Sequence, residues 1–331
     1  MGNDLLKREK LHSKNNHIEK IIMENFRYIG DIKKIETINH NDINSKNFLI
    51  HSKKSKYVLK FLKNNQQKRN KQIQRILYRA NKNGIKVAIP IKNESKQTLL
   101  DNVILSKFYN GKIFSGSVKE LESFAYELAK LHKFLKKSKV KLQEDANIRS
   151  YELLSSKDIT KIKRKIGQNP NKIDNIVKGK IEFLQQINKI HREFERKRKK
   201  FDEQLIHNDL HTDNIIFFKK NISVILDFYF MKRGTVLEDV SYSALRLSEQ
   251  TSKNFKNVEK MVNLFINTYS KYNKINQNEL FNFNYFLSKN SLARINHILR
   301  NRYFHDSNSW IQQLPLHLKL LDFSYKIKLE V

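Results

Sequence analysis

The sequence of 331 residues contains no cysteine, only three prolines and only eight glycines. The absence of cysteine excludes disulfide bonds, thiolate metal ligands and a cysteine nucleophile, and it fits a reducing compartment such as the cytoplasm. The prolines lie far apart, so no proline-rich linker divides the chain. No uncharged apolar run approaches the roughly 20 residues that a membrane-spanning helix needs.

The N-terminal segment, MGNDLLKREKLHSKNNHIEK, has no apolar stretch of the kind found in secretory signals. Gly2 invites a myristoylation motif, but that motif needs Ser or Thr at position 6, where this sequence has Leu6. We therefore expect a cytoplasmic protein without a membrane span. Residues 1–25 are expected to form a flexible or helical lead-in.

Acidic residues are scarce relative to basic ones: 33 Asp and Glu stand against 65 Lys and Arg, which gives a formal charge of +32. A charge of this size would suit binding to nucleic acid or to another anionic surface. The basic residues are, however, abundant along the whole chain, and no zinc finger, RNP-like aromatic motif or basic heptad region accompanies them. We therefore favour compositional drift and predict no specific nucleic-acid partner.

The first third of the chain is predicted to be rich in strands. Runs of β-branched and aromatic residues separated by polar turns indicate strands at 32–38, 47–51 and 56–62. A helical pattern follows, with a C-cap signal at Gly84 and an apolar face made by Ile73, Ile76, Leu77 and Ala80. Short strands are expected near residues 87–91 and 99–108.

The remainder of the chain has mostly helical spacing, for example at 121–135 and 177–194. One β-hairpin interrupts it, with strands at 215–218 and 224–228 joined by the polar turn 219–221. This order of elements predicts an α+β fold with two lobes. The small β-rich lobe is expected to comprise residues 1–105, and the larger, mainly helical lobe residues 106–331.

The most informative segment is LIHNDLHTDNIIFF, residues 205–218. It contains a His-x-Asp-x-x-x-x-Asn pattern made by His207, Asp209 and Asn214, and Asp227 follows at the end of the next predicted strand. Each of these residue types alone is common in turns and at the ends of strands. Their order and spacing, with a hairpin between Asn214 and Asp227, predict a site for phosphoryl transfer.

Phosphoryl transfer accounts for these residue types. Its transition state spreads negative charge over phosphate oxygens, so the protein mainly supplies metal ions and positioning. Asp209 is predicted to orient the attacking hydroxyl or to accept its proton. The hairpin brings Asn214 and Asp227 to one end of the ribbon, where they are predicted to ligate Mg²⁺ through hard oxygen donors.

This segment resembles the aminoglycoside phosphotransferase/choline kinase family, whose members carry loops such as H-G-D-L-H-x-x-N followed by I-D-F. The resemblance spans about residues 30 to 250. It implies a two-lobed protein-kinase-like fold, ATP and Mg²⁺ as cofactors, and transfer to a hydroxyl of a small molecule. Protein kinases usually have Arg and Gly where this chain has Asn208 and Tyr229, which favours the small-molecule branch.

Two further stretches resemble family elements. Gly234–Asp239 is similar to the G-x-x-x-x-D element, whose Asp is generally structural, and Leu128–His132 is similar to the L-A-x-L-H helix. A buried helix face alone would also explain the second stretch. Within the predicted catalytic loop, His207 is expected to brace the backbone by hydrogen bonding, while Asp209 acts on the acceptor.

The N-terminal lobe carries the predicted nucleotide contacts. One lysine lies inside an apolar strand where such kinases bind the α/β-phosphates, and a solvent-facing strand lysine is the alternative. The turn at 42–47 resembles the phosphate-covering loop, although it lacks glycine, and the connector at 105–111 resembles the hinge whose backbone holds adenine. The predicted nucleotide contacts are therefore Lys60, Ser45, Ser106 and Phe108.

One departure from the family pattern matters for activity. Active relatives usually place a Glu on the helix of the small lobe to pair with the strand lysine, yet residues 43–93 contain neither Asp nor Glu. Gln72 or Gln74 lies nearest the expected place and would hydrogen-bond Lys60 without neutralising it. Either the loss lowers activity, or another carboxylate such as Asp227 substitutes.

Three functions stay open at this point. The complete set of Asp209, Asn214 and Asp227 favours a small-molecule kinase. The missing Glu leaves room for a kinase-fold binding or structural protein, since some spore-coat proteins resemble this family closely. A nucleic-acid binder rests on charge alone.

The acceptor is less well defined than the reaction. Aminoglycosides and choline are cationic and need acids or aromatic cages, so a chain with this charge favours a neutral or anionic acceptor. Sugars, amino-acid alcohols and glycan precursors fit that description. Local acids would still suit a cation, namely Asp213, Glu238, Asp306 and Asp322. Either the acceptor site or the core would account for Tyr303, His305 and Trp310.

Overall fold

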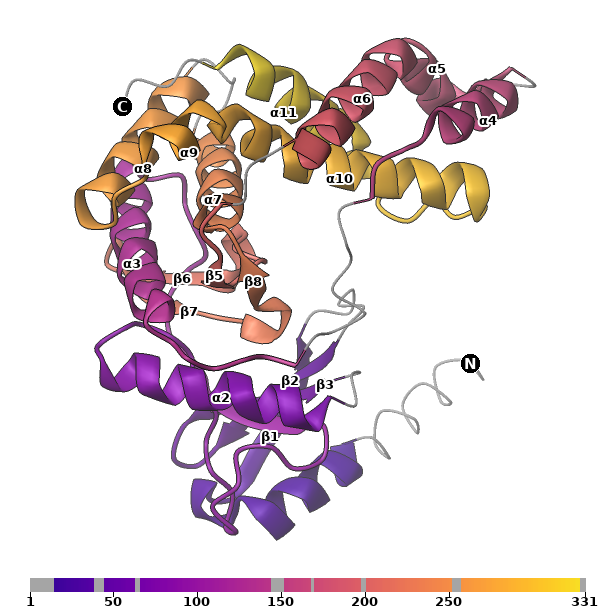
Figure 1. The fold of residues 1–331 in the computed structure, drawn as a ribbon. Helices are drawn as coiled ribbons and strands as arrows, with labels where there is room; N and C mark the ends of the chain where they lie inside the picture. The colour runs from indigo at the N-terminus through magenta and orange to yellow at the C-terminus, as the bar shows by residue number, and fades with distance from the viewer. Residues whose placement is uncertain are drawn as a thin grey trace, which may run out of the picture. The chain divides into compact units, whose positions relative to one another are not determined.

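The computed structural model describes residues 15–38, 45–62, 66–143, 152–167, 170–197, 201–251 and 257–327. These residues belong to two compact units, shown with their elements in Figure 1. The first unit comprises Met1–Ile113, Ser138–Glu144 and Asn214–Tyr229, and the second comprises Phe114–Lys137, Asp145–Asp213 and Phe230–Val331. The expected α+β kinase-like architecture is confirmed, and the hairpin belongs with the N-terminal sheet.

The first unit is built on a four-stranded antiparallel sheet in the order β1-β2-β3-β4. The strands of this sheet are β1 (Ile32–Ile38), β2 (Ser45–Ser52), β3 (Lys56–Leu62) and β4 (Val103–Lys107). The strand expected near residues 87–91 is wrong, because only isolated bridges form there, at Val87 and Pro90. Proline has no N–H to donate to a ladder, which limits pairing at this point.

Alternate residues of these strands form the core of the first unit together with an N-terminal helix. Residues 15–25 are helical, while residues 1–14 of the predicted lead-in lie outside the described part. Buried side chains of the helix and the sheet form one apolar cluster, which includes Ile18, Ile22, Phe26, Phe48, Ile50, Leu59 and Leu105. Burying these side chains stabilises the sheet on the face that carries them.

Helix α2 (Gln67–Lys82) follows the sheet and buries the apolar face predicted from the sequence. The chain leaves the helix through Gly84, whose φ of 73° lies in the left-handed region that glycine adopts without strain. The C-cap signal in the sequence is therefore confirmed.

The predicted hairpin forms from β6 (Ile215–Phe218) and β7 (Asn221–Ile225). The second strand was predicted at 224–228 and is wrong by three residues. The turn consists of Lys219 and Lys220, whose positive φ values of 49° and 65° match the twist that a two-residue hairpin loop requires. Asp227 consequently lies two residues beyond the end of β7.

The second unit is mainly helical. Its elements are α3 (Val118–Lys136), α4 (Ser156–Ile166), α5 (Lys172–Lys178), α6 (Ile181–Lys197), α7 (Val236–Thr251), α8 (Val258–Tyr272), α9 (Gln277–Phe281), α10 (Phe283–Phe304) and α11 (Leu314–Lys326), with the short strands β5 (Gln204–Ile206) and β8 (Lys232–Gly234) paired antiparallel. The helical spacing predicted over 177–194 is divided between α5 and α6, because α5 ends at Gly179.

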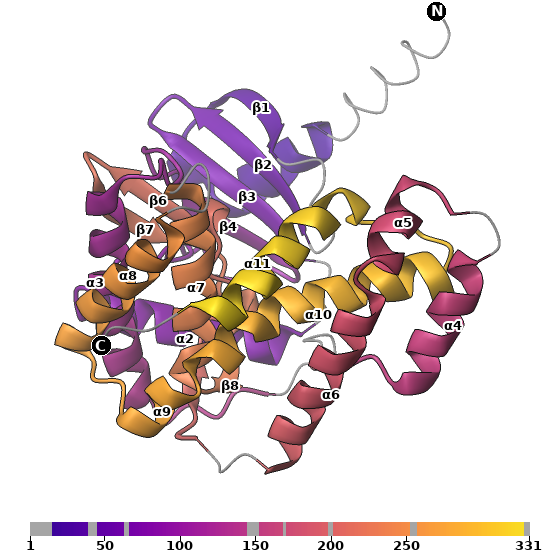
Figure 2. The same ribbon diagram turned by 90° about the horizontal axis from the view of Figure 1, so that it is seen from above.

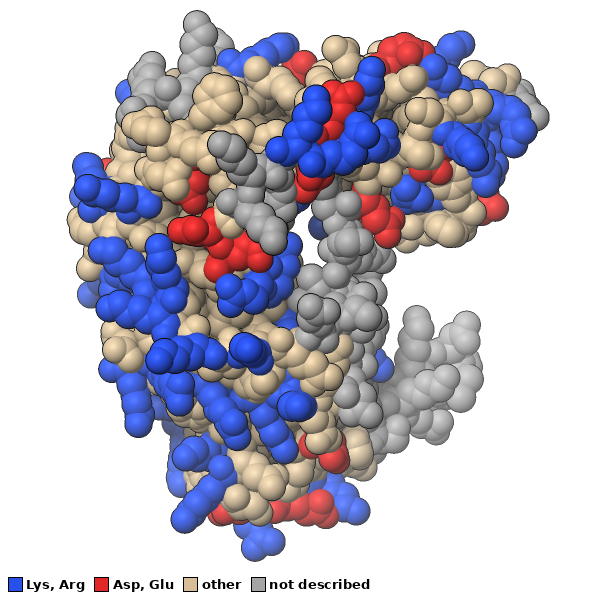
Figure 3. All heavy atoms as spheres, viewed as in Figure 1, with Lys and Arg blue, Asp and Glu red and all other residues tan. Residues whose placement is uncertain are grey.

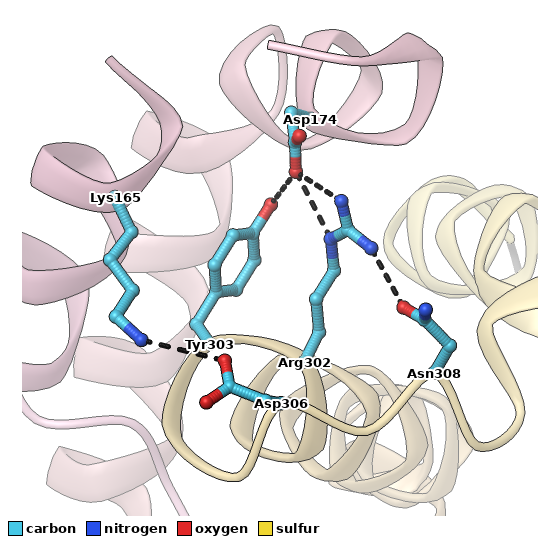
Figure 4. A pocket seen from close by; sticks show the side chains of 6 residues that line it. All are labelled: Lys165, Asp174, Arg302, Tyr303, Asp306 and Asn308. Carbon is cyan, nitrogen blue, oxygen red and sulfur yellow. Dashed lines mark hydrogen bonds and ion pairs between the residues drawn. The ribbon is translucent and has the colours of Figure 1, made fainter. Parts of the chain in front are cut away.

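A buried network attaches α5 to the end of α10 (Figure 4). Oδ1 of Asp174 accepts hydrogen bonds from Arg302 Nε (3.0 Å) and Nη2 (2.8 Å) and from the Tyr303 hydroxyl (2.7 Å). The same carboxylate caps α5 through the backbone N–H of Asn171. Burial raises the pKa of Asp174, but these donors outweigh burial and hold the pKa below its usual value. A hollow of about 290 Å³ lies beside the network.

Basic side chains predominate on the face of the molecule drawn in Figure 3. Lys and Arg occur over both units on this face, whereas Asp and Glu gather in a few places. None of the described helices is long and apolar enough to cross a membrane.

The Asp174–Arg302 pair predicts a large effect on stability. The Arg302 and Asp174 side chains are only 16% and 9% exposed, so Arg302→Gln leaves a buried carboxylate without its main partner. We expect the free energy of unfolding to fall by about 3 kcal/mol, measured by denaturant titration.

Lys163→Gln is the matched control, because it breaks an ion pair with Glu182 whose side chains are 41% and 75% exposed. Its expected loss is below about 1 kcal/mol. Equal losses in the two variants would contradict a special role for the Asp174 network.

Candidate active site

Lys60 makes an ion pair with Asp227 in the first unit. Its Nζ donates a hydrogen bond of 2.7 Å to Oδ2 of Asp227, and the two side chains are 17% and 24% exposed. Lys60 comes from the middle of β3, while Asp227 follows β7 at a φ of 57°. Asp is among the few residue types that tolerate this left-handed backbone. The carboxylate that compensates the strand lysine therefore comes from the hairpin.

The two glutamines near the expected place of the helix Glu have other partners. Gln72 bonds the backbone of Lys141 and Gln143, and Gln74 bonds Thr98. Among the described residues, neither glutamine bonds Lys60. The sequence left open whether another carboxylate replaces the missing Glu. In the structure Asp227 contacts Lys60 and takes that place.

Tyr229 places an aromatic ring beside Lys60, and the sequence did not indicate this contact. The Lys60 Nζ lies 5.2 Å from the centre of the Tyr229 ring, within the range of a cation–π contact. Burial raises the pKa of the Tyr229 hydroxyl, Asp227 raises it further, and a hydrogen bond with Gln74 opposes this rise. The phenol therefore stays neutral. Tyr229 occupies the place where protein kinases usually carry glycine.

Asn214 and Asp227 offer oxygen donors at the same end of the hairpin. Pairing of Ile215 with Ile225 aligns the two strands, and the Leu226 N–H donates to the Asn214 carbonyl at 2.8 Å. Asn214 is only 8% exposed. One amide and one carboxylate fit Mg²⁺, which binds few protein oxygens and keeps waters and phosphate oxygens. Among the described residues, no group of three His, Asp or Glu forms a closed metal site.

The remaining predicted nucleotide contacts lie along the same sheet. Ser106 is in β4, where its hydroxyl lies 3.5 Å from the Val58 carbonyl. Phe108 is 36% exposed, and its N–H donates to the Lys56 carbonyl. Ser45 is the first residue of β2. Half of the predicted phosphate-covering turn, residues 42–44, lies outside the described residues, so these assignments stay predictions.

The loop with His207 and Asp209 belongs to the second unit. His207 is fully buried, and its Nδ1 accepts a hydrogen bond from the Asp209 N–H at 3.2 Å. Asn208 has a φ of 66°, a conformation that Asn adopts more readily than most residues other than glycine. Family loops place glycine at this position. On the far side of Asp209, His211 Nε2 lies 3.7 Å from the Asp209 carboxylate.

Asp239 anchors this loop from the start of α7. Its Oδ2 accepts the His207 N–H (2.7 Å) and a bond from His132 Nε2 (3.1 Å), and its Oδ1 accepts the Asn208 N–H (2.7 Å). Burial raises the pKa of Asp239, but the contacts with His132 and His207 outweigh burial and hold it below the usual value. The two family-like stretches of the sequence thus meet at one carboxylate.

Comparison with known proteins places this geometry in a family. The model of the phosphotransferase enzyme family matches residues 34–259, which is more than half of the chain. The chain belongs to this phosphotransferase family. No curated protein matches the chain significantly. The resemblance predicted from the HNDLHTDN segment is confirmed.

Solved structures share the fold at low sequence identity. The amicoumacin kinase hAmiN, solved with AMP-PNP and Ca²⁺, is 13% identical with a TM-score of 0.67, covering 91% of this chain and 92% of its own. An aminoglycoside phosphotransferase from Alicyclobacillus acidocaldarius is 14% identical with a TM-score of 0.67, covering 90% of each chain. A microcompartment-associated aminopropanol kinase is 11% identical with a TM-score of 0.60, covering 90% and 92%.

Arg69 supports the segment that follows Asp227, and nothing in the sequence indicated this role. It is 2% exposed, and its guanidinium donates to the carbonyl of Gln143 (2.7 Å) and, more weakly, to that of Tyr229 (3.4 Å). It therefore ties α2 to the chain just after Asp227. An arginine in a lysine-rich helix gives no sequence signal, because it looks like part of a solvated face.

The buried anchor predicts a pH-dependent change in stability. Asp239→Asn replaces one acceptor oxygen by an NH₂ group facing an N–H, so we expect a loss of about 2 to 4 kcal/mol at pH 7. Since the folded-state pKa is depressed, this contribution is present above the unfolded value of about 4 and disappears as the pH falls through the folded value. Denaturant titrations from pH 7 to pH 3 test both points.

Asp322→Asn is the control, because Asp322 makes an exposed i,i+4 pair with Lys326. It should change the free energy of unfolding by less than about 0.5 kcal/mol. The free energies of unfolding of the wild type and of Asp239→Asn should differ less at pH 3 than at pH 7. An equal difference at both pH values would refute the view that Asp239 accepts these hydrogen bonds as an ionised carboxylate.

Proposed function

We propose that this phosphotransferase moves the γ-phosphate of ATP to a hydroxyl group of a small molecule in the presence of Mg²⁺. The observation that carries the proposal is the pair between Lys60 and Asp227 at 2.7 Å, next to Asn214 at the base of the same hairpin. It provides a phosphate-binding cation and metal ligands although the usual helix Glu is missing. The fold shared with a kinase solved with AMP-PNP and Ca²⁺ supports the choice of cofactors.

Each residue has a distinct role in this proposal. Asn214 and Asp227 hold Mg²⁺, which neutralises charge on the phosphate oxygens when bound. Lys60 binds the phosphates, and Ser45, Ser106 and Phe108 contact the nucleotide. Such groups catalyse transfer mainly by positioning and by electrostatic stabilisation.

Asp209 acts on the acceptor. Its carboxylate orients the hydroxyl and accepts its proton as the oxygen attacks the γ-phosphorus. His207 holds Asp209 in place by accepting its N–H, and the imidazole itself stays out of the reaction. The loop separates Asp209 from Asn214 by only four residues, so the acceptor and metal functions are carried by adjacent parts of the sequence.

A kinase-fold binding protein is the second candidate, and the absence of any acid in residues 43–93 favours it. In that case Lys60 and Asp227 would neutralise each other without a nucleotide. Nucleotide binding and ADP release separate the two candidates.

Asp209→Asn is expected to lower turnover by about 10²- to 10⁴-fold, the usual contribution of a general base, while ATP affinity stays within about twofold. The measurement is ADP release from Mg²⁺-ATP with pools of hydroxyl compounds, repeated with GTP. Asp202→Asn, a nearby aspartate outside the loop, serves as the control. Full activity in Asp209→Asn would refute this mechanism.

Asp227→Asn should remove the Mg²⁺ dependence of ATP binding, and Lys60→Gln should weaken binding by about tenfold or more through loss of a charge-assisted contact. Calorimetric titration with and without EDTA measures both effects. Lys82→Gln, an exposed lysine of α2, is the matched control. Nucleotide affinity that is identical in all three variants would favour the binding protein.

A further inference from the structure

The helix that carries the anchor Asp239 also presents Tyr242 and Arg246. These two residues are four apart in α7, so they lie on the same face of the helix. Burial raises the pKa of Tyr242, and the Asp209 carboxylate adds to the rise while Arg246 and Arg294 oppose it. Tyr242 is therefore close enough to interact electrostatically with the predicted catalytic carboxylate and with both guanidinium groups, all within the second unit.

Two more helices complete the cationic side of this cluster. Arg294 comes from α10 and His317 from α11, and α10 packs against both α7 and α11 (Figures 1 and 2). The Arg294 guanidinium lies 5.1 Å from the centre of the Trp310 ring. A guanidinium placed against an aromatic ring keeps N–H groups at its edge for hydrogen bonding.

Two buried nitrogen atoms in the cluster have no hydrogen-bond partner among the described residues: Nη1 of Arg246 and Nδ1 of His317. His317 is only 6% exposed. Burial, together with Arg246 and Arg294, lowers the pKa of His317 to about 3, so the ring is neutral and has one N–H to donate. Buried polar atoms are rarely left unpaired in the presence of their ligand.

Among the described residues, Glu249 is the only acid that forms an ion pair with either arginine. Its Oε2 lies 3.7 Å from Nη1 of Arg246, beyond hydrogen-bond distance, so Nη1 stays without a hydrogen-bond partner. Within the described part of the chain, Arg294 has no carboxylate at ion-pair distance. A partly buried cation without a counter-ion is costly, so Arg294 points to an anionic group supplied from outside.

We propose that Arg246, Arg294 and His317 form the acceptor subsite, and that they bind an anionic group, a carboxylate or a phosphate, of the hydroxyl compound that is phosphorylated. Tyr242 is near both this subsite and Asp209, so a compact molecule would place its hydroxyl at Asp209 while its anionic group rests on the arginines. The guanidinium fork suits both carboxylate and phosphate oxygens. This assignment rests on the proposed function and narrows its acceptor to anionic hydroxyl compounds.

Trp310 provides a direct readout, because it is the only tryptophan of the chain and it lies against Arg294. Its fluorescence is titrated, without nucleotide, with D-glycerate, glycerol 3-phosphate, glycerol and 1-amino-2-propanol. A saturable change with one of the two anions and none with the neutral or cationic compound is the expected result. Glycerate and glycerol 3-phosphate distinguish a carboxylate from a phosphate.

Arg246→Gln is expected to weaken anion binding by about 10- to 100-fold, because it removes a charge-assisted contact. Arg246→Lys keeps the charge without the fork and should lie in between, which guards against a variant that merely folds poorly. The control is Arg164→Gln, an exposed arginine of α4. Thermal unfolding of each variant verifies the fold.

The inference is overturned if neither anion gives a saturable change, if glycerol or the amine binds as well as the anions, or if Arg246→Gln binds anions like the wild type. ADP release with the same four compounds separates this outcome from failure of the proposed function. Anion binding without ADP release would keep the subsite and reject the transfer. ADP release with only the neutral or cationic compound would keep the transfer and reject the subsite.

Discussion

The carboxylate of Asp239 is 2% exposed and accepts hydrogen bonds from two parts of the chain that lie far apart in the sequence. Removing a carboxylate from water is expensive unless its lone pairs are used, and here the backbone of His207 and Asn208 and the ring of His132 use them. The conformation of the catalytic loop is thus coupled to the packing of α3 and α7. Asp239 thus holds the backbone next to Asp209, although no contact with the acceptor is proposed for it.

A similar requirement explains the replacement of the usual helix Glu in the first unit. Lys60 lies in a partly buried strand and needs a counter-charge, but the neighbouring helix contains no acid. The hairpin supplies Asp227 instead, from 167 residues further along the chain. Because Asp227 is also the proposed metal ligand, a cation at this carboxylate would compete with Lys60 and release it toward the phosphates. Metal and nucleotide binding are then linked through one carboxylate.

Local sequence patterns predicted those parts of the fold that depend on neighbours in the chain. Strands β1 and β3 have the predicted bounds, because runs of β-branched and aromatic residues between polar turns locate them. The bounds of β7 were wrong, because the apolar run VIL continues beyond the strand and hides where pairing stops. The HNDLHTDN motif located the loop, but its anchoring by both Asp239 and His132 required the packing of α3 against α7. The cluster of Arg246, Arg294 and His317 depends on three helices, and only the Tyr242–Arg246 spacing could have signalled it.

The net positive charge of the chain is a poor guide to the charge of its acceptor, even though it also favours an anion. Exposed basic side chains such as those in Figure 3 are screened by salt within about 10 Å. The energy of a charge rises as the surrounding dielectric falls, so two half-buried guanidinium groups outweigh many solvated lysines. The proposed preference for an anion therefore rests on a few side chains, two of which have nitrogen atoms without partners among the described residues. A relative with an acidic surface would make the same choice if it kept these arginines, and a basic one would not if it lost them.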